Sequence, residues 1–214
     1  MDTTGLSSVG LGITGLSAKD IITLIVAFAA FIISSLTYYY NVIKKADIKI
    51  VVGDLLMLNY FDEGKVNIGL NLTCFNEGAR PGALVKLTGK ILSLDNNKSS
   101  ELYWQCFIQS MNAGERGKNF KPWVDFAGWP ETIVAPGHSA VVRGIGFKTN
   151  DRFDLVKGDY KLLISGLEGS DLRELPEAEC EFKIASHEEQ FLRHMCVANS
   201  EGITEHMLFL FNRK

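Results

Sequence analysis

Residues 65–75, KVNIGLNLTCF, alternate between apolar residues and polar or small ones. Successive side chains of an extended strand point to opposite faces of a sheet, so the alternation sorts these residues into two faces. The apolar face carries Val66, Ile68, Leu70, Leu72 and Cys74. A strand with one apolar face is typical of an antiparallel sheet that covers a core on one side only.

The same period of two continues along the chain. Residues 84–92, LVKLTGKIL, repeat it, and the turn-forming sequence NEGARPG lies between the two strands. Further strands are predicted at residues 47–58, 101–109, 131–134, 140–147, 159–165 and 177–184. Short strands at nearly regular spacing, without long helical patterns between them, predict a mainly β domain built as an antiparallel β-sandwich.

Three stretches of this domain resemble a known group of proteins. They are NEGARPG at residues 76–82, PETIVAPGHSAVVRGIGF at 130–147 and GDYKLLISG at 158–166. They resemble the immunoglobulin-like sandwiches common in bacterial envelope and membrane proteins. In addition, the apolar stretch that ends at Lys44 and Lys45 and leads into a strand resembles a group of small, uncharacterised single-pass bacterial proteins. The resemblance covers roughly residues 20–184 and implies an immunoglobulin-like β-sandwich, but no functional residue. In such sandwiches a tyrosine hydroxyl ties a loop to the backbone; Tyr160 is the candidate, with an ordinary cross-strand aromatic as the alternative.

An uncharged stretch precedes the predicted sheet. Residues 20–45 read DIITLIVAFAAFIISSLTYYYNVIKK, and no side chain from Ile21 to Ile43 is charged. A helix of that length reaches about 35 Å, enough for a hydrocarbon core of about 30 Å. The stretch also lacks the polar stripe of a soluble core helix. It predicts one transmembrane α-helix, with the lipid bilayer as the partner of residues 21–43.

The ends of this stretch suit a membrane interface. Tyr38, Tyr39 and Tyr40 would form an aromatic belt, and Lys44 and Lys45 stop the apolar run. Cleavage at the small-x-small motif of residues 27–29 would leave a short signal core, so an uncleaved anchor is favoured over a signal peptide.

The flanking charges predict an orientation and a domain organisation. Basic residues are concentrated after the helix rather than before it, which favours a bacterial inner-membrane protein with its C-terminal domain in the cytoplasm. A periplasmic domain is the alternative. The predicted parts are a flexible N-terminal tail at residues 1–19, the anchor at 20–45 and the β-sandwich at 46–214.

Composition argues against some functional classes. The chain has 22 Lys and Arg residues against 25 Asp and Glu, so it lacks the basic surplus of a nucleic-acid binder. The cysteines, which have no CxxC spacing, are Cys74, Cys106, Cys180 and Cys196. Two disulfides are permitted, but buried thiols in a reducing compartment are favoured. The sequence GERGKN at residues 114–119 lacks the spacing of a phosphate loop, and no cofactor is predicted.

The C-terminal part changes character after residue 184. Ser186 and Glu189 have the spacing of a capping box, and the sequence that follows predicts a short amphipathic helix packed on an end of the sandwich. The residues expected on its apolar face are Phe191, Leu192, Met195 and Cys196. The final run HMLFLFNRK predicts a buried strand, with a tail that touches the membrane as the alternative.

Two histidines in this helix are the nearest approach to a metal site. His187 and His194 lie two helical turns apart, and Cys196 is the third candidate ligand. Glu188 or Glu189 would have to be reoriented to supply the fourth ligand of a closed zinc site. We therefore predict no metal site, and a metal-dependent enzyme is the less favoured alternative.

The long segment NAGERGKNFKPWVDFAGWP, residues 112–130, is the candidate interaction loop. Aromatic and cationic side chains lie together in it, as they do in many binding hot spots. Its candidate residues are Arg116, Lys118, Phe120, Lys121, Trp123, Phe126 and Trp129. The alternatives are that the aromatic side chains fold inward to cap the core, or that the loop contacts the membrane surface.

These observations predict a membrane-anchored β-sandwich that binds or tethers an unknown protein partner and is not an enzyme. A serine or cysteine triad would need a positioned base, and none of the four histidines lies in a recognisable nucleophile context. The alternative is a periplasmic ligand-binding or envelope-assembly domain.

Overall fold

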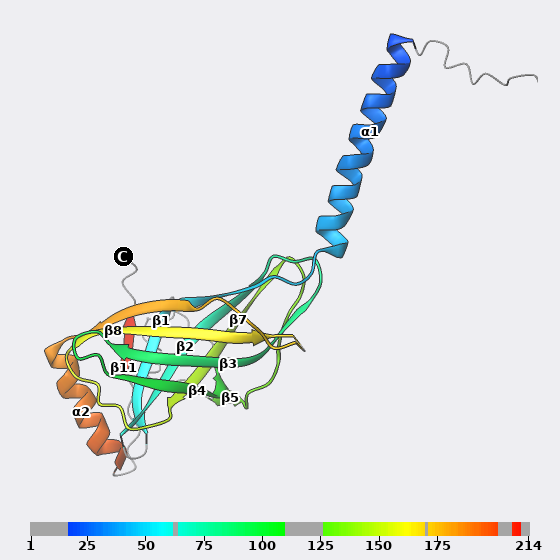
Figure 1. Ribbon diagram of the computed structural model, residues 1–214. Coiled ribbons are helices and arrows are strands. Elements are labelled where there is room, and N and C mark those ends of the chain that lie inside the picture. The colour runs from blue at the N-terminus through cyan, green and yellow to red at the C-terminus, as the bar shows by residue number, and fades with distance from the viewer. Residues whose placement is uncertain (1–16, 62–63, 110–125, 170, 201–206, 211–214) are drawn as a thin grey trace, which may run out of the picture. The chain divides into compact units, whose positions relative to one another are not determined.

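The computed structural model describes residues 17–61, 64–109, 126–169, 171–200 and 207–210 (Figure 1). The contacts between residues divide the chain into two units, Met1–Ile43 and Lys44–Lys214. The first unit contains the apolar N-terminal helix, and the second contains the β-sheet.

The N-terminal helix consists of α1 (Ala18–Tyr38) followed by a π-helical segment, η1 (Tyr39–Ile43). Ser17 caps it: its hydroxyl accepts a hydrogen bond from the Asp20 N–H, and the Asp20 carboxylate accepts one from the Ser17 N–H. The Thr37 hydroxyl donates to the Ile33 carbonyl at 2.7 Å, which reduces the cost of a polar group in an apolar helix. Residues Ala18–Ile43 are long and apolar enough to span a membrane or to serve as a signal sequence.

The second unit is mainly β. Its strands are β1 (Ile48–Phe61), β2 (Lys65–Asn76), β3 (Gly82–Ser93), β4 (Ser99–Ile108), β5 (Phe126–Gly128), β6 (Ile133–Ala135), β7 (Ser139–Thr149), β8 (Gly158–Glu168), β9 (Arg173–Glu174), β10 (Ala178–Ile184) and β11 (Met207–Leu210). Each strand expected from the sequence is present, within a few residues at its ends. The short β5 and β9 have no clear signal in the sequence.

The described strands form one antiparallel sheet that curls around its core. Their order is β10-β8-β3-β4-β7-β2-β1-β11, with β5, β6 and β9 paired to β4, β3 and β8. Register shifts interrupt β1 between Val52 and Leu56 and β4 between Trp104 and Cys106. Such bulges increase the local twist and help a sheet to curl. The mainly antiparallel β class is confirmed, whereas the two-sheet immunoglobulin-like sandwich stays a prediction.

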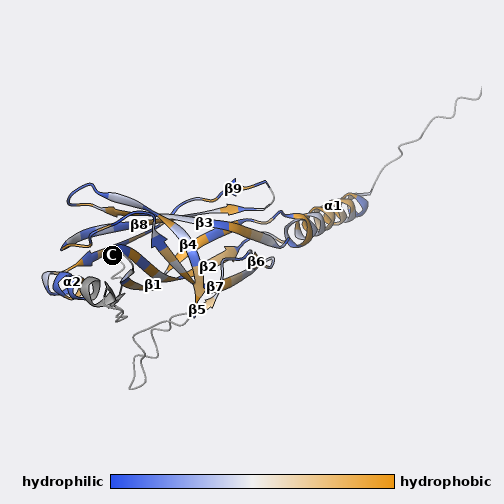
Figure 2. Ribbon diagram, turned by 90° about the horizontal axis from the view of Figure 1, so that it is seen from below, coloured by the Kyte–Doolittle hydropathy of each residue, from blue (hydrophilic) through white to orange (hydrophobic). Residues whose placement is uncertain are grey.

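The core lies inside this curl. The alternating residues Val66, Ile68, Leu70, Leu72 and Cys74 are each 0% exposed, as the sequence predicts. Residues of β1, β3, β7 and β8 join them in one hydrophobic cluster, and β1 also lies against β8 and β10. Figure 2 shows the hydrophobic colour concentrated on β1, β2 and β7 and on α1.

The helix α2 (Ser186–Ser200) packs against β1 and confirms the expected C-terminal helix (Figure 1). The expected cap is wrong by one residue: Ser186 is already helical, and the Glu188 carboxylate accepts from the N–H of Ala185 at 2.6 Å. Glu189 instead pairs with Arg193 and accepts from the Lys157 N–H. Leu192 is buried in the core, as expected, whereas Phe191 is 40% exposed.

Two buried tyrosines hold the loop between β7 and β8. The Tyr160 hydroxyl donates to the Val156 carbonyl at 2.8 Å and accepts from the Val156 N–H at 2.9 Å. The Tyr60 hydroxyl accepts from the Leu155 N–H at 2.6 Å. These contacts confirm that the Tyr160 hydroxyl ties a loop to the backbone.

Candidate functional site

A groove of about 220 Å³ crosses the outward face of the sheet, opposite the core. Cross-strand pairing forms its floor, because Met57 pairs with Gly69, Gly69 with Gly146, and Gly146 with Cys106. This row runs from β1 through β2 and β7 to β4. The groove therefore lies on strands whose opposite face packs in the hydrophobic core.

Two glycines keep the floor of the groove low. A Cβ atom on Gly69 would lie 2.8 Å from Met57 Cε and 3.0 Å from Ile108 Cδ1. A Cβ atom on Gly146 would lie 2.7 Å from Cys106 Sγ. The side chains that contact the two glycines are those of Met57, Ile108 and Cys106. A side chain in place of either glycine would clash with them.

A bulge in β4 shapes one wall. Trp104 pairs with Phe147 and Cys106 with Gly146, so Gln105 is the extra residue of β4 at this point. Bulges re-aim side chains next to binding sites. Both Gln105 and Cys106 line the groove as a result.

The lining is uncharged. Among the described residues that form it, the polar side chains are those of Asn59, Asn67, Gln105 and Cys106. The Asn67 Oδ1 atom accepts no hydrogen bond from any part of the chain that the structure describes. Burial raises the pKa of the Cys106 thiol, which keeps it in its neutral form. The groove consequently favours neutral ligands over ionised ones.

An exposed aromatic pair forms part of the groove lining. The rings of Phe126 and Trp129 meet edge to face at 5.1 Å, and the side chains are 56% and 73% exposed. Pairing between Phe126 and Ile108 joins the aromatic pair to the outward face of the sheet. The inward orientation that the sequence left open does not apply to these two residues.

The remaining candidates of the interaction loop lie outside the described residues. They are Arg116, Lys118, Phe120, Lys121 and Trp123. The described part of the candidate site therefore consists of Phe126, Trp129 and the groove beside them.

The residues expected at a membrane interface end the helix and begin the second unit. Tyr38 ends α1, and Tyr39 and Tyr40 meet edge to face at 5.6 Å in η1. All three tyrosines are exposed in the structure. Lys45 is also exposed, whereas Lys44 is half-buried.

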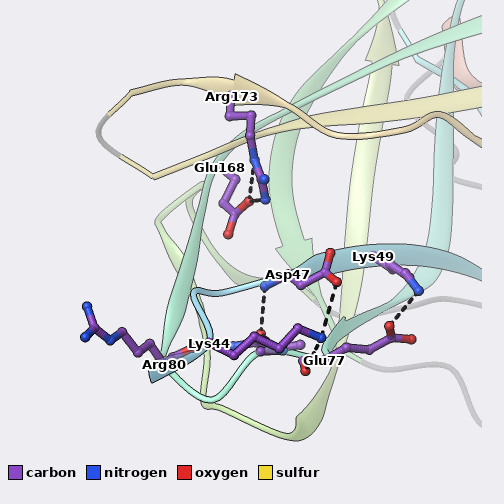
Figure 3. Close-up of polar contacts among 9 residues, drawn as sticks. Lys44, Asp47, Lys49, Glu77, Arg80, Glu168 and Arg173 are labelled. Carbon is purple, nitrogen blue, oxygen red and sulfur yellow. Dashed lines mark hydrogen bonds and ion pairs between the residues drawn. The ribbon is translucent and has the colours of Figure 1, made fainter. Parts of the chain in front are cut away.

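Lys44 belongs to a network of polar contacts with the turn after β2 (Figure 3). Its carbonyl accepts from the Ala79 and Arg80 N–H groups at 3.0 and 3.2 Å, and its ammonium donates to the Glu77 carbonyl. Lys49 forms an ion pair with Glu77 at 2.7 Å, which lowers the pKa of the Glu77 carboxyl. The first residues of the β unit are thus held to the turn at residues 77–80.

The possible metal ligands do not come together. His187 and His194 are exposed on α2, and no group of three His, Cys, Asp or Glu side chains within the described residues could hold a metal ion. The side chain of Cys196 lies outside the described residues. Cys74 and Cys106 carry free thiols, and Cys180 lies half-buried on β10.

Sequence reasoning missed most of the groove. Gly146 packs closely against Cys106. Met57, Gly69 and Ile108 look like ordinary strand residues in the sequence, because their role depends on pairing between distant strands. The bulge at Gln105 also has no sequence signal.

Comparisons with known proteins give no family. No family model matches the sequence, and no curated protein matches it. Among solved structures, a FixG-related protein from Vibrio parahaemolyticus is 13% identical, with 64% of this chain and 94% of that chain covered and a TM-score of 0.34. An ApaA protein from Bordetella pertussis is 10% identical, with 80% and 98% covered and a TM-score of 0.34.

Proposed function

We propose that this protein is a non-catalytic interaction module, held at a membrane by residues 21–43, that binds a protein partner through its groove. The observation that carries the proposal is the exposed pair of Phe126 and Trp129 beside an uncharged groove. Aromatic side chains of this kind supply much of the binding energy in protein interfaces.

The helix supports the membrane part of the proposal. Residues Ala18–Ile43 contain an 18-residue window with a mean hydropathy of 2.3, and no part of that window is buried in a core. At ~1.5 Å per residue they reach about 39 Å, more than the roughly 30 Å of a hydrocarbon core. A bilayer would cover the exposed apolar side chains of the helix.

The proposal places the β unit on the cytoplasmic side of a bacterial inner membrane. The lysines Lys44, Lys45 and Lys49 follow the helix directly, and basic flanks resist translocation. The free thiols of Cys74 and Cys106 suit a reducing compartment. An immunoglobulin-like type for the domain is part of the same proposal, supported by the antiparallel strands and by the Tyr160 contacts.

Co-purification tests the proposed interaction. The full chain is expressed with an affinity tag in its native host, extracted in mild detergent, and compared with a Trp129→Ala/Phe126→Ala variant. The variant is expected to lose at least about 90% of its partner, because losing two hot-spot residues costs several kcal/mol.

Val142→Ala is the matched control, since Val142 is 47% exposed on the same sheet but does not line the groove. It should keep the partner. Equal recovery of the same partner with the wild type and the double variant would reject the proposed function.

A further inference from the structure

We propose that the groove binds one large apolar side chain of an uncharged, extended peptide segment, whose backbone adds to the edge of β5 that no described strand pairs with. This inference rests on the proposed function and names the chemistry of the partner. Four features of the groove support it: its size, its lining, its floor and the neighbouring strand edge.

The size of the groove fits one side chain. Sites for small molecules and cofactors enclose roughly 300–1,000 Å³, and this groove has a volume of about 220 Å³. An interface pocket that receives a single aromatic or aliphatic anchor is smaller than a cofactor site. The volume therefore favours a side chain of a protein partner over a complete metabolite.

The lining selects an uncharged segment. Met57, Ile108, Phe126 and Trp129 provide apolar walls, and no described residue of the lining carries a formal charge. A buried charge of the ligand would find no counter-ion here, so acidic or basic side chains are disfavoured. The Gln105 carboxamide can donate and accept hydrogen bonds, as a peptide group does, and so complements a backbone passing the rim.

The floor allows a side chain to reach the sheet. Gly69 and Gly146 are adjacent in neighbouring strands, so backbone rather than side chain lies at the centre of the groove. The nearest side-chain atoms are the Met57 methyl, the Ile108 methyl and the Cys106 thiol. These groups are apolar or weakly polar, and they suit the tip of an aromatic or aliphatic side chain.

The edge of β5 provides the backbone contact. Among the strands that the structure describes, β5 (Phe126–Gly128) pairs with β4 alone. A strand edge of this kind offers main-chain N–H and C=O groups to an added extended peptide, while pockets beside it receive alternate side chains. Phe126 belongs to β5 and also lines the groove, so one peptide segment can contact both.

Three synthetic peptides of defined sequence test the inference. The probe is acetyl-Thr-Val-Trp-Val-Thr-amide; the second peptide has Asp in place of Trp, and the third is N-methylated at all five residues. The full chain is reconstituted in lipid nanodiscs, and the rate of alkylation of Cys106 by iodoacetamide is followed by peptide mapping. The measurement is made near pH 8.5, because thiolate is the reactive form and burial raises the pKa of this thiol.

The Trp peptide is expected to slow alkylation of Cys106 at least about threefold at millimolar concentration, the affinity range of short peptides. Alkylation of Cys180, which lies on β10 outside the groove, should not change. The Asp peptide should have little effect because of its charge. The N-methylated peptide should also have little effect, because it lacks the donors for strand addition.

Two variants give the matched controls. Trp129→Ala should abolish the protection, whereas Tyr103→Ala should keep it, since Tyr103 is 41% exposed on β4 and does not line the groove. The absence of protection by the Trp peptide would overturn the inference, as would equal protection by the Asp peptide. Equal protection by the N-methylated peptide would overturn the addition to β5.

Other occupants of the groove would also be recognised. Protection of Cys106 that grows with protein concentration in the absence of peptide would identify a second copy and overturn the inference. Protection without peptide that is lost on deletion of residues 112–123 would identify the chain's own segment, with the same consequence. If the peptides fail while co-purification still depends on Trp129, the inference falls and the proposed function stands.

Discussion

Asn76 makes four hydrogen bonds at the end of the sheet where the β unit begins. Its Oδ1 atom accepts from the Asp47 and Gly78 N–H groups at 3.1 and 2.9 Å. Its Nδ2 atom donates to the Arg80 and Ala135 carbonyls at 2.8 and 3.0 Å. One side chain that is 2% exposed therefore joins the start of β1, the turn after β2 and the end of β6.

Replacing Asn76 should destabilise the fold strongly. Asn76→Ala leaves several backbone groups without partners, so we expect the free energy of unfolding to fall by about 3 kcal/mol. The measurement is urea unfolding of the full chain in detergent. Asn96→Ala is the control, because Asn96 makes a single exposed contact with the Lys98 N–H. Equal stability losses in the two variants would contradict the role given to Asn76.

Cys74 should make stability depend on alkaline pH. Burial in the core raises the pKa of its thiol from an ordinary value of 9.0 to about 11. Above pH 9 the unfolded chain loses this proton while the folded chain keeps it, so rising pH stabilises the unfolded state. The contribution of the thiol to stability is thus complete below pH 9 and is lost as pH rises through about 11.

The expected loss from Cys74 is at most about 1.4 kcal/mol per pH unit over this window. It is measured as the difference between the wild type and Cys74→Ala in unfolding experiments from pH 8 to pH 11. The wild type should lose more stability than the variant as pH rises. Parallel pH profiles of the two proteins would show that Cys74 is not buried as described.

At the scale of elements, the turn after β2 depends on a glycine for space rather than for backbone conformation. A Cβ atom on Gly78 would lie 1.9 Å from the Lys45 carbonyl oxygen, and one on Gly137 would lie 1.9 Å from the Ala79 carbonyl oxygen. The turns at both glycines are therefore packed against backbone, which cannot move aside as a flexible side chain can.

Gly78→Ala should destabilise the protein by at least about 1–3 kcal/mol, the range for overpacking a close contact. Gly128→Ala is the matched control, because nothing lies within 4 Å of the position of its added Cβ atom. The two variants are compared by thermal unfolding of the full chain. A Gly78→Ala melting temperature equal to that of Gly128→Ala would contradict the packing of this turn.

The strands themselves were largely predictable, and the reason is local. The residues of β2 alternate with a period of two, and each apolar residue named from the sequence is fully buried. Curling of the sheet was not predictable, because it depends on bulges. At one of them, Gln105 of β4 has no pairing partner in β7, and only the register between the two strands reveals this. The groove depends on the same pairing, so only its aromatic residues Phe126 and Trp129 had a signal in the sequence.

At the scale of the whole molecule, one chain combines an apolar helix with a β unit that carries a groove. No residue separates the two: η1 ends at Ile43, and Lys44 already belongs to the β unit through its bonds to Ala79 and Arg80. A bilayer that holds the helix would therefore keep the start of the β unit at its surface. We infer that a bound partner would be held at the membrane.

Charges in the helix should release the protein from the membrane. Each Arg at the centre of a spanning helix costs about 2.5–3.5 kcal/mol of insertion free energy. Phe28→Arg combined with Ile32→Arg should move the protein from the carbonate-resistant membrane pellet to the supernatant, whereas the wild type remains in the pellet. Arg at the exposed Val134 and Val142 of the β unit is the control and should not change the distribution. A wild-type chain recovered uncleaved in the supernatant would contradict membrane anchoring.

Photo-crosslinking in intact cells shows whether the groove faces a protein at the membrane. A benzophenone amino acid replaces Trp129 in one strain and Tyr103, outside the groove, in another. We expect a discrete crosslinked protein in the membrane fraction for position 129 and none for position 103. The absence of a crosslink at position 129, or the same crosslinks at both positions, would show that the groove does not bind a protein partner.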